Sequence, residues 1–282
     1  MLYTLKNNII SVTVNTTGGS MTSVIYLPEN EERLWQGSEF WRGQDVVIFP
    51  LIGHAGEYSF CGEKFAPKSH GVARYSEFIA ESIEEDGITL LLESNDETRK
   101  TYPFDFIFKI NYKLTGSSVK ITYTVKSLKG KIPFYVGGHP GMVAPRGEAW
   151  IEFENAENPI VYPLEGGNAN IYNKVKKFKA DKALFKKVKT LQLGNLSGGA
   201  VYVYTSDGYR YSFQSDCPVF AIWSNEDGGD FICVEPWWGI NDFSFAPREI
   251  TLKPFMNFAD ENGSNFSYKL SLKKVAECNK SV

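Results

Sequence analysis

Three histidines are the residues whose type and setting first suggest chemistry in this chain. His54, His70 and His139 each adjoin a glycine, and a proline follows His139 as well. Glycine and proline mark loops and strand ends, where a rigid scaffold displays functional groups. Because the pKa of histidine lies near neutrality, such a side chain can give or take a proton. A single histidine of this kind is more often an ordinary polar loop residue, but the same setting in all three indicates a proton-transfer site.

The second candidate for proton transfer is Glu235, in the motif Cys233-Val234-Glu235-Pro236-Trp237-Trp238-Gly239. Glu235 follows an apolar run that begins at Phe231, so we expect its carboxyl group to be nearly buried. Burial raises the pKa of a carboxyl group toward the range that suits a general base. Trp237 and Trp238 offer flat apolar faces on which a sugar ring could stack. The plainer alternative is a glutamate at the rim of the core beside structural tryptophans.

Motifs for other kinds of chemistry are absent from the sequence. It contains no G-x-S-x-G, no phosphate-binding G-x-x-x-x-G-K-[ST] or G-x-G-x-x-G, and no H-E-x-x-H. Metal ligation by the three histidines is conceivable on a β-scaffold, but the ligands lack clustered spacing. The cysteines, at positions 61, 217, 233 and 278, form neither a C-x-x-C pair nor a disulfide framework. We therefore expect free thiols, no metal and no cofactor.

The composition narrows the classes of partner. The chain has 282 residues, of which 43% are hydrophobic, so it can bury a sizeable core. Its formal net charge of -3 gives no attraction to nucleic acid or to an anionic membrane. The N-terminal residues lack the apolar segment of a signal peptide, and no apolar run reaches transmembrane length. We expect a cytoplasmic protein whose partner is a small molecule; the sequence leaves the oligomeric state open.

A hydrophobic period of two dominates the chain and predicts β-strands. From Phe104 to Leu114 the even positions are apolar and the odd ones mostly polar, and residues 119–125 repeat the pattern beyond a polar turn. This pattern predicts a β-hairpin with one buried face. Comparable strand patterns recur at residues 11–14, 22–27, 88–92, 201–204, 209–213 and 266–272, and the continuous apolar runs 219–223 and 231–234 predict buried strands.

These strands predict one all-β domain over residues 1–282, built as a sandwich of two large antiparallel sheets. A barrel stays open as an alternative, because strand patterns do not decide closure. Residues 174–189 are the best helical candidate, but their hydrophobic period is ragged and predicts at most a short turn of helix.

Three motifs, in this order, resemble the signatures of aldose 1-epimerases, also called galactose mutarotases. They are KSHGVAR at 68–74, GGHP at 137–140 and CVEPW at 233–237. Residues 50–54 and 102–104 also fall in the family order, and the resemblance, in particular to the LacX-like branch, spans nearly the whole chain. It implies a galactose-mutarotase-like antiparallel β-sandwich, or supersandwich, with an open cleft for a free aldose on one sheet face.

The resemblance also implies an activity, the interconversion of the α and β anomers of a hexose by acid/base-catalysed ring opening and closure, without metal or cofactor. In the family, the histidine that matches His139 protonates the ring oxygen, and the glutamate that matches Glu235 takes the proton of the anomeric hydroxyl. The histidine that matches His70 assists at the ring oxygen and positions the sugar. By the same motifs, Arg74 and Trp237 are expected to bind the substrate.

Two sugar-binding positions depart from the family pattern. His54 stands where the family commonly has arginine, and Lys189 aligns with an aspartate, for which the nearby Asp181 is a possible substitute. These departures keep a second reading open, a carbohydrate-binding or sensing protein of the same fold with little turnover. The lysine-rich residues 174–189 indicate a solvated face or, alternatively, a site for a phosphorylated hexose. A sandwich module that binds another protein is a third reading.

Overall fold

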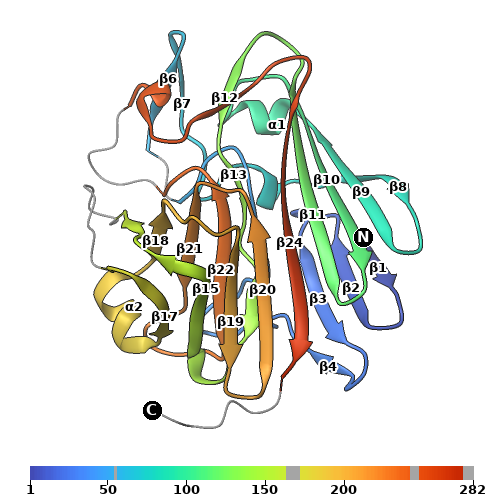
Figure 1. Ribbon diagram of the computed structural model, residues 1–282. Helices are drawn as coiled ribbons and strands as arrows, with labels where there is room; N and C mark the ends of the chain where they lie inside the picture. Colours follow the sequence, from blue (N-terminus) through green and yellow to red (C-terminus); the bar gives the residue numbers. More distant parts are fainter. Residues whose placement is uncertain (54–55, 163–171, 242–247, 276–282) are drawn as a thin grey trace.

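The computed structural model describes residues 1–53, 56–162, 172–241 and 248–275 of the chain. Two large antiparallel sheets, of nine and seven strands, form most of this described part (Figure 1). Among the described strands, the first and last of each sheet do not pair with each other, so the sheets are open. The predicted all-β sandwich is therefore confirmed, and the barrel alternative is not.

The nine-stranded sheet crosses Figure 1 from β17 near the left edge to β8 at the right. In order across the sheet, its strands are β17 (Val175–Ala180), β15 (Ala149–Glu157), β19 (Ala200–Thr205), β20 (Tyr209–Ser215), β24 (Ser264–Lys274), β11 (Ser118–Ser127), β10 (Phe106–Thr115), β9 (Gly87–Glu93) and β8 (Ile79–Ile83).

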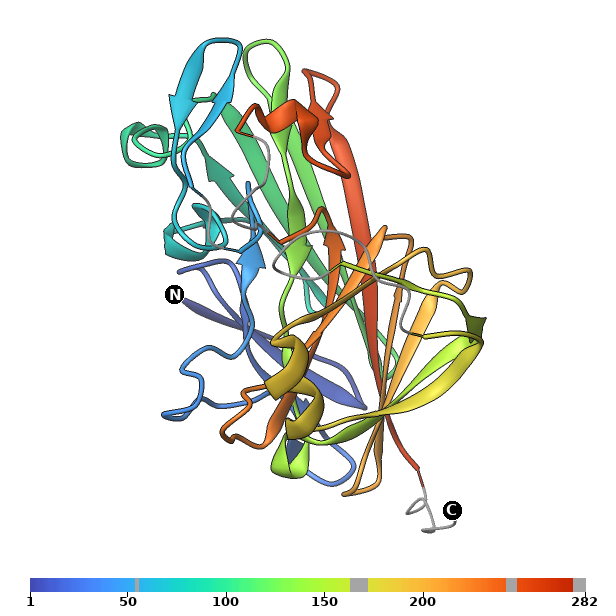
Figure 2. The ribbon, with the colours of Figure 1, turned by 90° about the vertical axis from the view of Figure 1, so that its left-hand side faces the viewer.

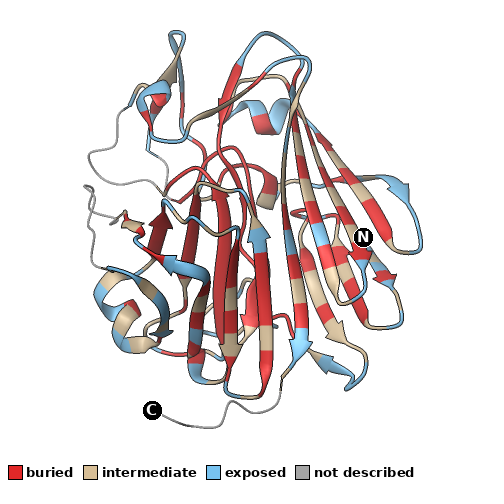
Figure 3. Cartoon of the chain, in the orientation of Figure 1, coloured by how far each residue is buried: buried red, intermediate tan, exposed pale blue. Residues whose placement is uncertain are grey.

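The seven-stranded sheet carries the continuous apolar runs of the sequence. Its strands, in order, are β16 (Ile160–Val161), β18 (Leu191–Gly194), β21 (Val219–Trp223), β22 (Phe231–Trp238), β13 (Val136–Gly138) and β5 (Val47–Ile48), with β14 (Gly141–Val143) also paired to β22. Every residue of β22 is buried, and β21 is nearly so (Figure 3). A strand covered on both faces needs apolar residues at consecutive positions, which explains why these runs do not alternate.

Smaller elements complete the described part. They are a four-stranded N-terminal sheet of β1 (Leu2–Lys6), β2 (Ile10–Asn15), β3 (Met21–Tyr26) and β4 (Glu31–Glu32), the hairpin β6 (Tyr58–Phe60)–β7 (Glu63–Phe65), the pair β12 (Ile132–Phe134)–β23 (Asn257–Ala259), the helices α1 (Asp96–Arg99) and α2 (Lys182–Val188), and the 3₁₀ turns η1 (Ala73–Tyr75), η2 (Pro145–Gly147) and η3 (Ile250–Leu252). The β6–β7 hairpin projects at the top of both ribbon views (Figure 2). Within the described residues, no helix has the length and apolar character required to traverse a bilayer.

The core forms where the apolar faces of the two large sheets meet. The predicted hairpin exists as β10 and β11, and the apolar positions of both strands are buried. Phe49, next to β5 of one sheet, stacks on Phe108 of the other with ring centroids 4.5 Å apart. Trp238 of β22 meets Phe266 of β24 edge-on, with ring centroids 5.4 Å apart. Aromatic pairs of this kind bury large areas and fix the distance between the sheets.

Residues 174–189, predicted to hold at most a short turn of helix, also contain a strand that was not predicted. Residues Val175–Ala180 form strand β17, which pairs with β15 at the edge of the nine-stranded sheet, and only Lys182–Val188 are helical. Pairing with β15 overrides a local sequence that has no clear period of either kind. The helix begins at Asp181, whose side chain accepts a hydrogen bond from the backbone N–H of Leu184 at 3.1 Å.

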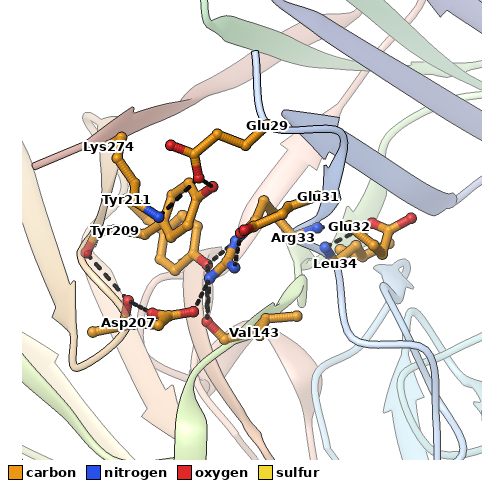
Figure 4. Close-up of polar contacts among 11 residues, drawn as sticks. Glu29, Glu31, Glu32, Arg33, Leu34, Val143, Asp207, Tyr209, Tyr211 and Lys274 are labelled. Carbon is orange, nitrogen blue, oxygen red and sulfur yellow. Dashed lines mark hydrogen bonds and ion pairs between the residues drawn. The ribbon is translucent and has the colours of Figure 1, made fainter. Parts of the chain in front are cut away.

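A buried arginine joins the N-terminal sheet to the nine-stranded sheet (Figure 4). The side chain of Arg33, just after β4, is 4% exposed. Its Nε donates to the hydroxyl of Tyr211 at 2.9 Å, and its Nη2 donates to Asp207 at 2.8 Å. The guanidinium group also lies 3.6 Å from the ring centroid of Tyr209. Both tyrosines belong to β20, so one side chain connects the two sheets.

Replacing Arg33 with alanine should destabilise the protein strongly. The change leaves Asp207 and the Tyr211 hydroxyl without their charged partner in a largely buried setting, where breaking such a pair typically costs about 3 kcal/mol. Urea unfolding at neutral pH measures the loss. As a control, Lys100→Ala removes an exposed ion pair with Glu97 and should cost under about 1 kcal/mol. Equal losses for the two variants would contradict a structural role for Arg33.

Candidate active site

A cavity of about 340 Å³ opens on one face of the seven-stranded sheet. Its lining combines ionisable side chains with indole rings and a few small polar residues: His70, His139, Glu235, Trp41, Trp223, Trp237, Gly53, Ser69, Thr190 and Asn241. A second cavity, of about 360 Å³, lies near Tyr58 and Arg248 and contains none of the predicted proton-transfer residues. The first cavity is therefore the candidate active site.

Strand β22 places Glu235 at this cavity. Side chains alternate along a strand, so Cys233, Glu235 and Trp237 share one face, while Trp238 points to the opposite face and contacts β24. On the neighbouring strand β21, Glu235 is paired with Ala221. The small alanine side chain leaves room beside the carboxyl group. Glu235 is only 1% exposed, as its position after the apolar run predicts.

His139 is placed opposite Glu235 by the register of β22 with its two neighbours. Strand β13 pairs Gly137 with Trp237, and strand β14 pairs Gly141 with Cys233. The same antiparallel register brings residue 139, between the two strands, across from residue 235. Residues directly opposite each other project their side chains on the same face of a sheet. The imidazole and the carboxyl group therefore meet although the sequence separates them widely.

The imidazole of His139 and the carboxyl group of Glu235 lie close enough to share one proton. Nε2 of His139 is 3.4 Å from Oε2 of Glu235. The imidazole stacks on the indole of Trp41, with ring centroids 5.1 Å apart and planes 23° from parallel, and meets Trp223 edge-on at 5.6 Å. These two rings restrict the orientation of the imidazole. Glycine is required just before His139, because a Cβ atom at Gly138 would lie 2.5 Å from the hydroxyl of Tyr268.

His70 approaches the pair from a loop. Its ring centroid is 5.6 Å from that of His139, and the two planes are nearly perpendicular. The backbone N–H of Gly53 donates to Nδ1 of His70 at 3.3 Å, and the backbone N–H of His70 donates to the Gly53 carbonyl at 2.9 Å. The first bond leaves the proton of the neutral ring on Nε2. His70 has a φ of 61°, a strained backbone conformation that often occurs at functional sites.

Burial favours the uncharged form of both members of the pair. It raises the pKa of Glu235 well above its usual value, and the nearby carboxyl of Asp45 adds to the rise while Trp237 opposes it. Burial also lowers the pKa of His139 well below its usual value, and the charges of His70 and Arg74 add to that fall. In the sugar-free protein the single shared proton therefore resides mainly on the carboxyl group.

Several polar atoms around the cavity are buried without a hydrogen-bond partner in the described structure. They include Oε2 of Glu235, Nδ1 of His139 and Nε1 of Trp237. An unpaired buried polar group typically costs about 1–3 kcal/mol, so natural proteins retain such groups mainly where a ligand or water completes them. Acceptors and donors set among indole faces suit a small polyhydroxyl molecule.

The same face also offers a set of metal-ligand donors. His139, Cys233 and Glu235 each supply one donor atom, and these atoms lie within 4.8 Å of one another. Nitrogen, sulfur and oxygen donors of this kind suit Zn²⁺. The sequence instead suggested, as a remote possibility, ligation by three histidines, of which His54 lies outside the described residues. The expectation that the protein uses no metal stays a prediction.

The structure places two of the predicted sugar-binding residues away from the cavity lining. Asp181 caps helix α2 and lies 3.5 Å from Lys179. Lys189, at the end of the same helix, forms an ion pair with Glu226 at 2.5 Å. Neither is among the residues that line the cavity. Their roles in sugar binding stay predictions, without support from their positions.

The other predicted contacts fall in three groups. Trp237 lines the cavity, whereas Trp238 belongs to the opposite face of β22. Arg74, in η1, is half-buried and acts on His139 through its charge without lining the cavity. His54 lies outside the described residues, so the space expected for the family arginine is not described.

The residues of the lining that sequence reasoning missed include Trp41, Trp223 and Asn241. Trp41 lies in a segment without regular structure, where no hydrophobic period marks it. Trp223 is the last residue of a continuous apolar run, and this position predicts a core residue. A possible signal was the aromatic cluster Trp35, Phe40 and Trp41 in a segment with few other apolar residues, because exposed aromatics often mark binding sites.

Comparison with known proteins decides the family. A family model described as aldose 1-epimerase matches residues 1–154, more than half of the chain. The chain belongs to the aldose 1-epimerase family. Among curated relatives, the chromosomal and plasmid forms of protein LacX from Lactococcus lactis subsp. lactis are each 28% identical over 269 residues, covering 86% of this chain and 89% of theirs. The predicted likeness to the LacX-like branch is thus confirmed.

Solved structures of similar fold agree with the assignment to this family. A galactose mutarotase related enzyme from Lactobacillus acidophilus is 28% identical, with a TM-score of 0.88 over 98% of this chain and 99% of the other. A galactose mutarotase-like protein from Lactobacillus casei has a TM-score of 0.90 at 21% identity, over 97% and 100% of the two chains. Galactose 1-epimerase from Lactobacillus acidophilus shares the fold at 12% identity, with a TM-score of 0.74 over 98% and 95%. The galactose-mutarotase-like architecture is confirmed.

The imidazole of His139 should titrate below the usual histidine pKa of about 6.5. Because burial lowers its pKa in the folded state, the unfolded chain binds a proton first as the pH falls. His139 therefore makes the protein less stable as the pH decreases below that value. Proton NMR of the sugar-free protein, with His139→Gln to assign the signal, measures the midpoint. A midpoint at or above 6.5 would contradict the effect of burial.

Proposed function

We propose that this protein is an aldose 1-epimerase that interconverts the α and β anomers of a hexose. The observation that carries the proposal is the pair formed by His139 and Glu235, whose Nε2 and Oε2 atoms lie 3.4 Å apart in a cavity of about 340 Å³. Small-molecule sites span roughly 300–1,000 Å³, and the lower end of this range suits one monosaccharide. Membership of the aldose 1-epimerase family supports the same reaction.

The reaction needs two coordinated proton transfers. A cyclic hemiacetal opens when its anomeric hydroxyl loses a proton while its ring oxygen gains one. The open aldehyde then rotates about its C1–C2 bond and closes on either face. In the proposed roles, Glu235 takes the hydroxyl proton and His139 gives a proton to the ring oxygen; each such transfer typically contributes about 10²–10⁴-fold to the rate.

The protonation state that burial favours is one of the two states of this cycle. Ring opening starts from a carboxylate and an imidazolium, and it leaves a carboxylic acid and a neutral imidazole. The second state is the one that burial favours in the sugar-free protein. Both states carry one proton in total, so they interconvert by moving it across the 3.4 Å between the two side chains. Hydrogen bonds from sugar hydroxyls to Oε2, which is otherwise unpaired, stabilise the carboxylate state.

The remaining residues of the cavity suit the binding of a sugar. Trp41, Trp223 and Trp237 supply indole faces for the apolar side of a pyranose ring. His70, held by Gly53 through two hydrogen bonds, is the third proposed contact, at the ring oxygen. The chemistry itself calls for no cofactor. A cytoplasmic location stays a prediction.

The observations favour an uncharged hexose over a hexose phosphate. None of the described residues that line the cavity is a lysine or an arginine. Lysines of the 174–189 stretch instead form ion pairs outside the cavity, for example Lys179 with Glu148 at 3.0 Å and Lys177 with Glu152 at 3.7 Å. The interpretation of residues 174–189 as a solvated, ion-paired surface therefore has more support than their interpretation as a phosphate-binding site.

Replacing Glu235 with glutamine, or His139 with glutamine, should reduce mutarotation by about 10²–10⁴-fold, because each removes one proton transfer. Polarimetry on freshly dissolved α-glucose and α-galactose, with NMR exchange at equilibrium, measures the rate. Lys100→Ala is the matched control: it removes an exposed ion pair with Glu97 outside the cavity and should leave the rate within about twofold.

Two outcomes would count against the proposal. If no aldose, phosphorylated or not, equilibrates faster than in buffer at high protein concentration, the enzyme proposal fails. Calorimetric binding of a sugar in that case would select the carbohydrate-binding reading. If the rate is high but survives both Glu235→Gln and His139→Gln, the proposed roles of the pair are wrong.

A further inference from the structure

A thiol lies beside the proton-transfer pair and takes no part in the proposed reaction. Cys233 is fully buried on β22, two residues before Glu235. Side chains two positions apart on a strand project from the same face, so the thiol and the carboxyl group share the side that carries the cavity. Together with His139 they supply sulfur, oxygen and nitrogen donor atoms, which all lie within 4.8 Å of one another.

Strand register surrounds the thiol with one glycine and two indole rings. Cys233 pairs with Gly141 of β14 on one side and with Trp223 of β21 on the other. The glycine brings no side chain to this face, and the indole of Trp41 lies over its position, since a Cβ atom at Gly141 would be 2.5 Å from that ring. The same indole stacks on His139. Trp41 and Trp223 therefore cover the donor set.

The spacing of the donor atoms fits a tetrahedral metal ion. Two nitrogen or oxygen ligands, with bonds of about 2.0–2.1 Å to one zinc ion, lie roughly 3.3–3.4 Å apart. Nε2 of His139 and Oε2 of Glu235 are 3.4 Å apart. A sulfur ligand, with a bond of about 2.3 Å, belongs roughly 3.6 Å from the other two. Because its sulfur is already within 4.8 Å of them, side-chain adjustments of about 1 Å bring Cys233 to that distance.

An unsatisfied polar atom and the balance of charge also point to a cation at this place. Oε2 of Glu235 is buried and has no hydrogen-bond partner in the described structure. A doubly charged cation balances the negative charges of one thiolate and one carboxylate, which leaves a neutral site in a dry region. On binding, three bonds from the metal to sulfur, oxygen and a neutral imidazole form, and the protons of the thiol and the carboxyl group pass to solvent.

We propose that His139, Cys233 and Glu235 form a binding site for Zn²⁺, and that bound zinc inhibits the mutarotase. The inhibition rests on the proposed function, because the metal occupies the two atoms between which the proton moves; the site itself does not. Two of the three donor residues line the cavity, so the fourth position of the metal faces the space of the sugar. Zinc and productive sugar binding therefore exclude each other.

The surroundings of His139 indicate reversible binding and not a resident cofactor. A histidine that holds a resident metal usually donates its second ring N–H to a carboxylate or a carbonyl. Nδ1 of His139 is buried without such a partner among the described residues. Lack of that second bond typically weakens metal affinity by about 10–100-fold. We therefore expect a chelator to remove the zinc and to leave a folded protein.

Cobalt(II) reports a thiolate ligand directly and without turnover. We expect Co²⁺, added to the chelator-treated protein, to give the near-ultraviolet charge-transfer band of a cobalt–thiolate bond, and Zn²⁺ to displace it. Cys233→Ser should abolish this band. Cys217→Ser is the matched control and should keep it, because Cys217 is a half-buried thiol outside the donor set, where it donates to the Val219 carbonyl at 3.2 Å.

The spectra can contradict the site in two ways. A band that survives Cys233→Ser places the metal on another thiol, such as the exposed Cys61, and the absence of a band in the wild-type protein excludes the site. If Cys233→Ser does not fold, His139→Gln and Glu235→Gln test the same set. Each removes one donor and should weaken zinc binding, measured by calorimetry, at least about tenfold. Unchanged affinity in both variants refutes the proposal.

The mutarotation assay tests the inhibition. Saturating Zn²⁺ should lower the wild-type rate at least about tenfold, because it withdraws both proton-transfer groups, and a chelator should restore the rate. Cys233→Ser should raise the zinc concentration for half-inhibition at least about tenfold. Rates with and without zinc are compared within each protein, so a change in basal rate does not enter. Activation by zinc, or equal inhibition of the two proteins, overturns the proposal.

The two kinds of measurement separate this inference from the proposed function. A cobalt–thiolate band that depends on Cys233, in a protein without mutarotase activity, refutes the proposed function and supports the metal site. Mutarotase activity in a protein that gives no such band supports the function and refutes the site.

Discussion

A carboxyl group on a strand covered on both faces is the constraint on which the rest of this structure depends. Glu235 is almost inaccessible to solvent, and the imidazole of His139 lies 3.4 Å from its carboxyl group. Water would solvate either group well, whereas the interior of a sheet stack penalises charge on both. The pair therefore stays close to electrical neutrality. The indole walls strengthen this effect because they exclude water.

The spacing of that pair follows from strand register. His139 lies between two short strands that pair with the two ends of β22, so hydrogen-bonded ladders on both sides fix its position. A one-residue slip would turn the imidazole to the opposite face of the sheet. The pair thus rests on paired strands, whereas His70 and Trp41 reach it from segments without regular structure. Two hydrogen bonds with Gly53 hold His70, one to its ring and one to its backbone.

Sequence predicted the features that depend on local pattern. Alternation identified β10, β11 and β24, and the unbroken apolar run identified β22 and the burial of Glu235. The contributions of Trp41 and Asn241 to the cavity depend on long-range packing, which no local period records. Residues 175–180 form a strand only because β15 offers them a partner. The meeting of His139 with Glu235 was expected from family resemblance, since the register that causes it is set by pairings distant in sequence.

Strand β17 has a further consequence for the behaviour of the protein at high concentration. Among the described strands it is the outermost of the nine-stranded sheet, and an uncovered outermost strand invites the addition of a strand from another molecule. Lys176, Lys177 and Lys179 are all exposed along it. Two molecules that approached each other through this strand would bring these positive charges together and repel. Lysines along an outermost strand are a common protection against the addition of a strand from another molecule.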